Sequence, residues 1–263
     1  MGYQTIFKRY ELKYLLTRRQ KELLVETMKP YMALDQYGHS TIRNIYYDTD
    51  TYRLIRRSLD KPVYKEKLRV RSYAKANAED SVFVELKKKY DSVVYKRRIV
   101  LPLQQAQEWL DGKKERPCQT QIAEEIDYFL SYYRTLHPVV FLSYEREAFY
   151  PLNGGEFRVT FDENIRCRRE ELSLGTEIFG TPLLSEDQIL MEIKTPGGIP
   201  LWMTHFLTGQ HINRASYSKY GTAYREMIFP DNSARLRMDD KYRETEFDKG
   251  GNIYVKYDFS RTF

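Results

Sequence analysis

The chain has 263 residues, enough for one large domain or two small ones with a sizeable core. Its mean hydropathy is -0.66, and no run approaches the roughly 18 apolar residues that span a bilayer. The N-terminus also lacks the apolar segment of a secretory signal. We therefore expect no membrane span. Residues 1–100 hold 23 Lys and Arg against 12 Asp and Glu, whereas residues 101–263 hold 20 Lys and Arg against 25 Asp and Glu. This concentration of positive charge in the N-terminal part predicts an anionic ligand. Nucleic acid, polyphosphate, a nucleotide and an acidic membrane surface all fit.

In chain order the sequence predicts many strands and few helices. Thr17 opens a capping box for a helix over about 18–30, and Arg56 and Arg57 fit a short polar helix. Period-two alternation of β-branched and aromatic residues predicts strands at about 5–15, 41–48, 64–74, 81–89, 92–101, 138–149, 156–165 and 188–195. Further helices are expected near 103–112, 119–135, 200–208 and 216–227. Eight strands with intervening helices favour an α+β fold built on a closed or nearly closed antiparallel barrel.

The composition becomes polar from Pro230 onward. Gly250 and Gly251 are placed to turn a small hairpin between Phe247 and Val255. We therefore expect residues 1–229 to form the main domain and residues 230–263 to form a peripheral polar tail.

Side chains typical of disulfide, metal or triad sites are sparse. Cys118 and Cys167 are too few for a disulfide scaffold, and neither they nor the four histidines show ligand or triad spacing. We expect a reduced, cytoplasmic protein in which histidine supplies no general base.

The charged residues of the predicted strands share faces. Four cations at alternate positions lie about 7 Å apart on one face of the strand over 64–74: Lys65, Lys67, Arg69 and Arg71. Other predicted strands show the same arrangement, with Glu11 and Lys13, Glu85 and Lys87, Lys96 and Arg98, Arg158 and Asp162, and Glu192 and Lys194.

Two interpretations of these faces remain. The simpler one is the wet side of an antiparallel sheet. The other is a barrel whose polar face is turned inward and whose apolar outside is covered by helices. Stacked cations repel one another unless an anion lies among them, so the second interpretation predicts a tunnel for a chain of phosphates. Glutamates beside the cations would then help to hold a divalent cation that bridges phosphate oxygens.

Eight short segments of the chain carry a family resemblance. In order they are FKRYELKY (7–14), YYDT (46–49), KLRVR (67–71), VELK (84–87), YER (144–146), FRVTFD (157–162), LMEIK (190–194) and SYSKY (216–220). Each is weak alone, but the ordered set, over about residues 5–228, resembles the catalytic VTC (vacuolar transporter chaperone) domain of polyphosphate polymerases, in the triphosphate tunnel metalloenzyme superfamily.

This resemblance implies a tunnel-shaped eight-stranded antiparallel barrel with a basic interior and helices outside. The implied activity is metal-dependent transfer of the γ-phosphate of ATP onto a growing polyphosphate chain, with Mn²⁺ or Mg²⁺. The implied catalytic residues are Arg69, Arg71, Lys87 and Glu192. The implied metal ligand is Glu192, with Glu11 and Glu85 as further carboxylates. The implied substrate-binding residues are Lys13, Lys67, Lys96, Arg146, Arg158, Lys194, Ser218 and Lys219.

The sequence departs from the family pattern at one informative position. Arg9 stands where hydrolytic relatives carry the first Glu of a Glu-x-Glu-x-Lys motif. Loss of this carboxylate weakens a second metal site and favours a polymerase over a triphosphatase. Eukaryotic polymerase subunits associate with membrane-spanning proteins, so the resemblance also suggests a membrane-protein partner.

Three functions of different classes stay open. The first is a polymerase whose partners are ATP and inorganic polyphosphate. The second is a tunnel triphosphatase or polyphosphate hydrolase, in which water is the acceptor. The third is a non-catalytic binder of polyphosphate or nucleic acid. Nucleic acid is disfavoured, because its binding does not require Glu192 and favours cations on an exposed convex surface.

Overall fold

The computed structural model describes residues 10–91, 93–230, 245–247 and 253–255. The chain divides into two compact units, 1–223 and 224–263. The predicted strand residues 5–9 and the predicted turn at Gly250 and Gly251 lie outside the described residues.

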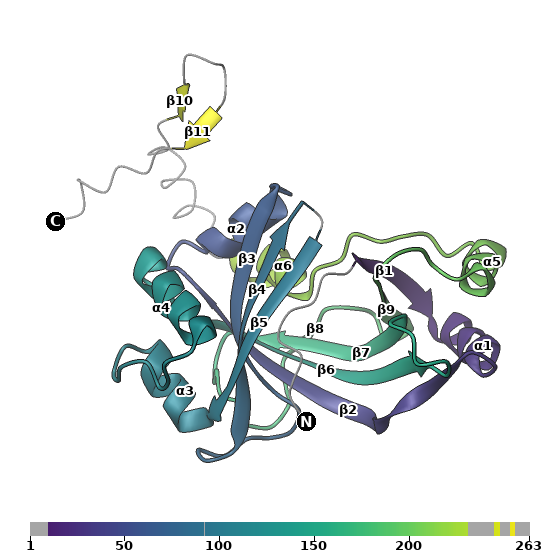
Figure 1. Cartoon of the computed structure of the whole chain (residues 1–263), viewed down its shortest axis with the longest axis horizontal. Coiled ribbons are helices and arrows are strands. Elements are labelled where there is room, and N and C mark those ends of the chain that lie inside the picture. Colours follow the sequence, from purple (N-terminus) through teal and green to yellow (C-terminus); the bar gives the residue numbers. More distant parts are fainter. Residues whose placement is uncertain (1–9, 92, 231–244, 248–252, 256–263) are drawn as a thin grey trace. The chain divides into compact units, whose positions relative to one another are not determined.

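Eight strands of the first unit form one continuous antiparallel sheet in the order β1-β9-β7-β6-β2-β3-β4-β5 (Figure 1). Their bounds are β1 (Tyr10–Thr17), β2 (Met32–Asp48), β3 (Tyr64–Ser72), β4 (Ser81–Tyr90), β5 (Val93–Pro102), β6 (His137–Pro151), β7 (Arg158–Arg168) and β9 (Gln188–Thr195). A ninth, very short strand, β8 (Thr181–Pro182), pairs with β7 outside this path. It has two residues, too few for a period-two signal in the sequence.

Helices connect these strands at the places that the sequence predicts. They are α1 (Arg18–Met28), α2 (Arg53–Leu59), α3 (Leu103–Leu110), α4 (Gln121–Tyr133), α5 (Leu201–Gly209) and α6 (Lys219–Ala223). The predicted capping box opens α1, because the Thr17 hydroxyl accepts the backbone N–H of Gln20 while the Gln20 side chain accepts that of Thr17. None of the helices in the described ranges is long and apolar enough to cross a bilayer.

The starts of β2 and α6 differ from the sequence prediction, each for a physical reason, and α6 ends at Ala223 instead of residue 227. β2 begins at Met32 instead of residue 41, because an irregularity between Leu34 and His39 interrupts its pairing with β6 and hides the alternation. α6 begins at Lys219 instead of residue 216, because the preceding segment is extended along the edge of β1, where the Ala215 N–H donates to the Lys13 carbonyl at 2.7 Å.

The apolar faces of the strands point outward and are covered by helices. One core lies between β2–β5 and the helices α2, α3 and α4. It includes Leu68, Val84, Leu86, Trp109, Ile126 and Phe129. A second core lies between β1, β6, β7 and β9 and the helices α1 and α5. It includes Leu24, Met28, Phe161, Met191, Ile193 and Met203. The side chains at alternate positions must therefore point inward.

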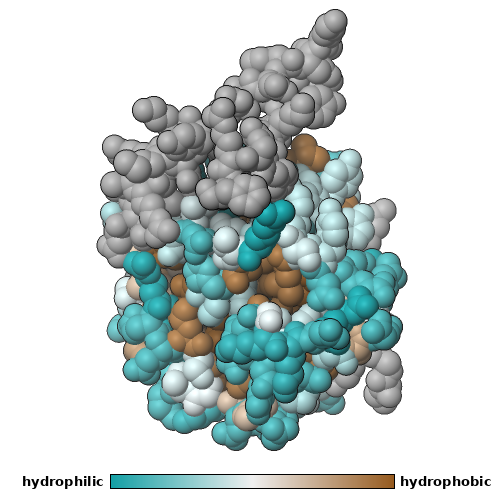
Figure 2. Space-filling model, turned by 90° about the vertical axis from the view of Figure 1, so that its left-hand side faces the viewer, coloured by the Kyte–Doolittle hydropathy of each residue, from teal (hydrophilic) through white to brown (hydrophobic). Residues whose placement is uncertain are grey.

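Among the coloured residues of the face on the side of α3 and α4, hydrophilic ones predominate, with apolar areas between them (Figure 2). This agrees with helices that turn one face to the sheet and the other to water.

The sheet curls into a nearly closed tunnel. In their described residues β1 and β5, the two ends of the strand order, share no ladder of hydrogen bonds. The two ends of the sheet nevertheless lie close together: Lys87 Nζ on β4 is 2.8 Å from Glu11 Oε2 on β1. The extended segment before α6 lies along the edge of β1, where Arg214 bridges to Tyr14. The expected tunnel-shaped barrel with a polar, basic interior is thus confirmed.

The second unit, taken by itself, contains a π-helical turn, η1 (Tyr224–Ile228), and a short antiparallel hairpin. The hairpin pairs β10 (Thr245–Phe247) with β11 (Ile253–Val255), as expected from the sequence.

Candidate active site

The inner face of the sheet forms a bore lined by charged side chains. Strand register explains their convergence, because Arg69 lies opposite Glu85, Lys67 opposite Lys87, and Lys87 opposite Lys96. On the other half of the barrel, Lys13 lies opposite Glu192. The structure brings all the site residues expected from the sequence to this face: Glu11, Lys13, Lys67, Arg69, Arg71, Glu85, Lys87, Lys96, Arg146, Arg158, Glu192, Lys194, Ser218 and Lys219.

Glu85 organises the cations of one wall. Its fully buried carboxylate lies 2.7 Å from Arg69 Nη2 and 2.6 Å from Lys96 Nζ, and Arg71 Nε is 3.8 Å away. Burial alone would raise the pKa of Glu85, but Arg71, Arg69 and Lys96 outweigh burial and hold that pKa well below its usual range. In this structure both oxygens of Glu85 face protein cations, so the carboxylate serves as their counterion.

Hydroxyl and amide groups on neighbouring strands fix the two arginines. The Arg69 guanidinium donates to Tyr46 Oη at 2.8 Å. The Arg71 guanidinium donates to Asn44 Oδ1 at 2.8 Å and to Tyr144 Oη at 2.9 Å. Tyr46 and Tyr144 belong to motifs visible in the sequence, but their partners depend on strand register. Asn44 gives no sequence signal, because a lone Asn in a strand is ordinary.

Asp162 and Glu192 organise the opposite wall. Arg146 binds Asp162 through two bonds of 2.6 and 2.7 Å, and Lys219 Nζ donates to the same carboxylate. Glu192 lies 3.3 Å from Lys13 Nζ and 3.1 Å from Lys194 Nζ. Asp162 was visible in the sequence on the face of Arg158, yet only the fold shows that it pairs with Arg146.

Burial competes with these ion pairs in setting protonation. It would raise the pKa of Glu192, but Lys13, Lys194 and Lys219 outweigh it and keep that pKa well below the usual range. Burial lowers the pKa of Lys194 to about 8 despite its carboxylate neighbour. For Lys219 the nearby Asp162 and Glu192 outweigh burial and raise the pKa to about 12.

Glu11 and Lys87 form an ion pair across the seam of the barrel. Burial would raise the pKa of Glu11, but the charge of Lys87, helped by that of Lys194, lowers it to about 2. Arg158 lies opposite Lys194 in the strand register, with its guanidinium 4.4 Å from the centre of the Tyr150 ring. The Glu11–Lys87 pair and Arg158 therefore extend the charged lining beyond the Glu85 and Glu192 clusters.

Asp48 is a positioning residue that the sequence did not single out as part of the site. Its fully buried carboxylate accepts the backbone N–H groups of Thr49, Leu54 and Ile55, which caps the start of α2. It also accepts the Tyr220 hydroxyl at 2.8 Å. Tyr220 follows Ser218 and Lys219 directly, so Asp48 helps to fix the segment that places both residues in the bore.

The bore carries a large positive surplus. Ten of the expected site residues are Lys or Arg, and they face four carboxylates, Glu11, Glu85, Asp162 and Glu192, so that cationic side chains outnumber carboxylates by six. An enclosed surplus of this size favours a ligand with several negative charges along its length.

The carboxylates of the bore do not form a ready metal site. The part of the chain that the structure describes contains no group of three or more His, Cys, Asp or Glu side chains able to hold a metal. Mg²⁺ is commonly held by one or two carboxylates together with phosphate oxygens. Both oxygens of Glu192 face protein cations, as those of Glu85 do, with Lys13 at Oε1 and Lys194 at Oε2. The described residues therefore do not fit a resident ion with an all-protein ligand set, and Glu192 would hold only a divalent ion that enters bound to phosphate.

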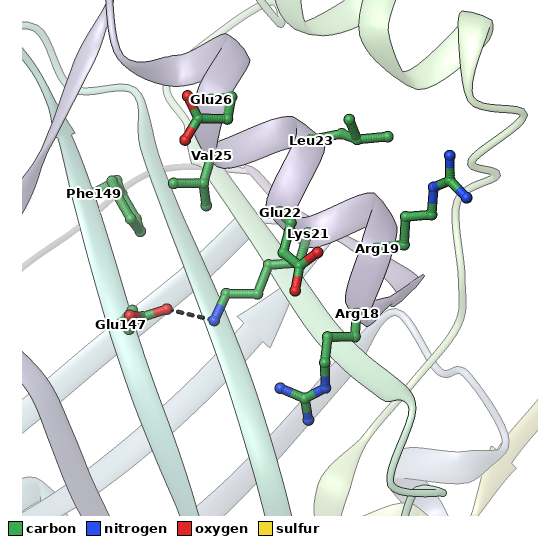
Figure 3. Close-up of a pocket in the computed structure, with 9 residues that line it drawn as sticks. All are labelled: Arg18, Arg19, Lys21, Glu22, Leu23, Val25, Glu26, Glu147 and Phe149. Carbon is green, nitrogen blue, oxygen red and sulfur yellow. Dashed lines mark ion pairs between the residues drawn. The ribbon is translucent and has the colours of Figure 1, made fainter.

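A groove of about 490 Å³ lies outside the bore, between α1 and β6. Lys21 points into it and pairs with Glu147 (Figure 3). The charges that line it are balanced, because Arg18, Arg19 and Lys21 are matched by Glu22, Glu26 and Glu147. Since this groove lacks the excess of cations found in the bore, the bore is the better candidate for the active site.

Comparisons with known proteins agree with this geometry. The family model described as the VTC domain matches residues 8–228. A proposed adenylate cyclase of Bacillus halodurans superposes with a TM-score of 0.51 and 15% identity, over 82% of this chain and 96% of its own. A proposed adenylyl cyclase from Hippeastrum is described as having a dominant triphosphatase activity. It superposes with a TM-score of 0.51 and 17% identity, over 83% of this chain and 95% of its own. At these identities the likeness shows the fold alone. Comparison with curated proteins gives no match.

Replacing Glu85 by Gln should destabilise the protein strongly. The substitution keeps the shape but leaves Arg69, Arg71 and Lys96 without their counterion, which should lower the free energy of unfolding by about 3–5 kcal/mol in urea titrations at pH 7. Because the pKa of Glu85 is depressed in the folded state, its contribution is present above the unfolded value and is lost as the pH falls. The difference between the two proteins should therefore shrink below about pH 4.

The matched control for this prediction is Glu177→Gln, which removes an exposed carboxylate paired with Lys75 and should have little effect. Equal stability of Glu85→Gln and Glu177→Gln would show that Glu85 is not the counterion of this wall.

Proposed function

The chain belongs to the VTC domain family, and from this membership we propose that it is a polyphosphate polymerase that transfers the γ-phosphate of ATP onto a growing inorganic polyphosphate chain. The observation that carries the proposal is the enclosed bore, in which ten cations face only four carboxylates. A linear chain of phosphates has the shape and the repeated negative charge that such a bore requires.

Arg69 and Arg71 are the residues best held for neutralising the transferred phosphoryl group. Transfer of a phosphoryl group depends mainly on positioning and on electrostatic stabilisation. Glu85 and the hydroxyl of Tyr46 orient Arg69, while Asn44 and Tyr144 orient Arg71. Both guanidinium groups are therefore fixed before substrate arrives, which lowers the cost of reorganisation during transfer.

The acceptor end of a polyphosphate chain needs no general base from the protein. A terminal phosphate is largely ionised near neutral pH, so its oxygen can attack without losing a proton to a side chain. Lys13, Lys87 and Lys194 would bind and align the two reacting phosphate groups. This agrees with a bore whose titratable groups are mainly cations and ion-paired carboxylates.

Glu192 is the proposed residue for a divalent ion, Mn²⁺ or Mg²⁺, that enters with the nucleotide. Such an ion supplies charge neutralisation between phosphate oxygens. Around it, Lys13, Lys194 and Lys219 hold Glu192 ionised and oriented.

Incubation with ATP and Mn²⁺ or Mg²⁺ tests the function directly. We expect ADP and polyphosphate to accumulate together, with little free phosphate, because the bore excludes much of the water that would compete as acceptor. Polymer is measured by gel electrophoresis, and free phosphate is measured separately.

Three alternative results would contradict this proposal in different ways. Free phosphate without polymer would indicate a tunnel triphosphatase or polyphosphate hydrolase. Tight polyphosphate binding without turnover would indicate a binding module. Preferential binding of nucleic acid over polyphosphate would contradict the proposed ligand.

Replacing Arg69 by Ala should reduce the rate of transfer on the order of 10³-fold, as expected when a cation that neutralises a transferring phosphoryl group is lost. The matched control is Arg97→Ala, which removes a cation from the outer face of β5, where it pairs with Glu125. Initial rates for the two variants are compared after circular dichroism has verified folding. A folded Arg69→Ala variant with the rate of Arg97→Ala would assign Arg69 a structural role only.

Replacing Glu192 by Gln should abolish turnover and reduce binding of Mn²⁺ in the presence of tripolyphosphate, because the variant lacks the anionic oxygen proposed for the metal. Electron paramagnetic resonance of Mn²⁺ measures the second effect without turnover. Glu163→Gln, at a carboxylate that binds Lys21 outside the bore, is the control. Full activity and unchanged Mn²⁺ binding in folded Glu192→Gln would remove the metal assignment.

A further inference from the structure

Lys67 is an exception among the cations of the bore. Its neighbours on three strands each have a carboxylate: Lys13 pairs with Glu192, Lys87 with Glu11, and Arg69 with Glu85. Lys67 forms no ion pair with any carboxylate in the described ranges 10–91 and 93–230. Among these neighbouring cations, Lys67 is therefore the one without a carboxylate partner in the described ranges.

The partner of Lys67 is a hydroxyl. Lys67 Nζ donates to Ser218 Oγ at 3.1 Å, and the same oxygen accepts the Gly221 backbone N–H at 3.1 Å. The aromatic ring of Tyr220 lies 5.9 Å from Lys67 Nζ, and its hydroxyl is held by Asp48. Ser218 Oγ thus accepts hydrogen bonds from Lys67 Nζ and from the Gly221 N–H. Its own O–H can therefore donate to a ligand. Lys67 and Ser218 together therefore offer two adjacent donors to one oxyanion.

The groups that face Lys67 are mostly positive. Lys13 approaches it from β1 and Lys87 from β4, while Lys65 and Arg69 flank it on β3. On the segment that leads into α6, Lys219 is engaged by Asp162 and so is already balanced. Burial, followed by the charges of Lys13, Lys87, Lys65 and Arg69, lowers the pKa of Lys67 to about 7. Burial lowers the pKa of Lys96 to about 7 as well, but Lys96 already has Glu85 beside it, whereas Lys67 has no carboxylate partner and a proton on it is costly until an anion arrives.

We propose that Lys67 and Ser218, two adjacent donors with no carboxylate partner at Lys67, form a proton-linked receptor for one phosphoryl oxygen, in which the Lys67 amine takes a proton from solvent as an ionised phosphate enters. The balance is simple: a neutral amine gains one proton and becomes an ammonium group that donates to the phosphoryl oxygen. This inference rests on the proposed function only in taking phosphate chains as the ligand.

The direction of the pH effect follows from this linkage. Binding that takes up a proton becomes weaker as the pH rises above the pKa of the free amine. Arg in place of Lys67 stays charged at every accessible pH, so its binding needs no proton. Between about pH 7.5 and 9.5, the affinity of the wild type should therefore fall by up to about tenfold per pH unit relative to Lys67→Arg.

Isothermal titration with inorganic tripolyphosphate tests the proposal. The number of protons taken up is obtained at pH 8 from titrations in buffers of different ionisation enthalpy. We expect the uptake by the wild type to exceed that of Lys67→Arg by roughly 0.5–0.9 proton, since an amine with a pKa near 7 is mostly neutral at pH 8. Protons carried by tripolyphosphate itself are common to both proteins and cancel in the difference.

The control is Lys113→Arg, at an exposed lysine paired with Asp111, which should take up as many protons as the wild type. Equal uptake by wild type and Lys67→Arg would overturn the proposal, whether or not the protein makes polymer. Conversely, the expected difference in uptake without polymer formation would uphold this receptor and contradict the polymerase.

A second variant keeps the proposal testable if binding to Lys67→Arg is too weak to titrate. The pKa of Lys67 is lower in the folded protein without ligand than in the unfolded chain. Between about pH 7 and 10.5 the unfolded chain therefore binds more protons than the folded protein, so the free energy of unfolding rises with pH through this group. Lys67→Met should lose this gain, and it should unfold at a higher temperature than the wild type at pH 7. A Lys67→Met protein that unfolds at a lower temperature, or that binds tripolyphosphate as tightly as the wild type, would overturn the proposal.

Discussion

The cost of burying charge determines how this sheet is arranged. Rows of Lys and Arg cannot enter an apolar core without counterions, because removing each charge from water costs several kcal/mol. The barrel avoids this cost by turning its charged face to an interior bore and its apolar face to the helices. Leu68 and Arg69 are neighbours on β3, yet one packs beneath helices and the other lines the bore. The covering helices are therefore as necessary to the site as the cations are.

Within the bore, carboxylates keep the cations in place. Glu85, Asp162 and Glu192 each contact more than one Lys or Arg, and each retains a lowered pKa despite burial. Such pairs add little net stability compared with apolar residues, but they fix the direction in which each cation points. This division of roles leaves a defined surplus of positive charge for a ligand and restricts the carboxylates available to a metal ion.

Period-two spacing was sufficient to predict most strands and the inward direction of the charged residues, because in a strand alternation alone decides which face a side chain occupies. It could not predict which carboxylate binds which cation. Asp162 meets Arg146 only because β6 pairs with β7 in one register. Nor could it assign Asp48 its role, since the contact with Tyr220 joins residues 172 positions apart. The seam between the first and last strands was equally hidden, because ladder hydrogen bonds do not define it.

The excess of six cationic side chains over carboxylates also bears on the length of the proposed polyphosphate product. Internal units of polyphosphate carry about one negative charge each, so a short stretch of about six units is enough to neutralise the bore. Any longer polymer must have its remaining charge balanced by dissolved counterions, whose release and uptake depend on ionic strength. Beyond that stretch the bore has no electrostatic means of distinguishing one polymer from a longer one. For the polymerase proposed above, the charge of the interior would therefore hold a growing polymer but would not set its final length.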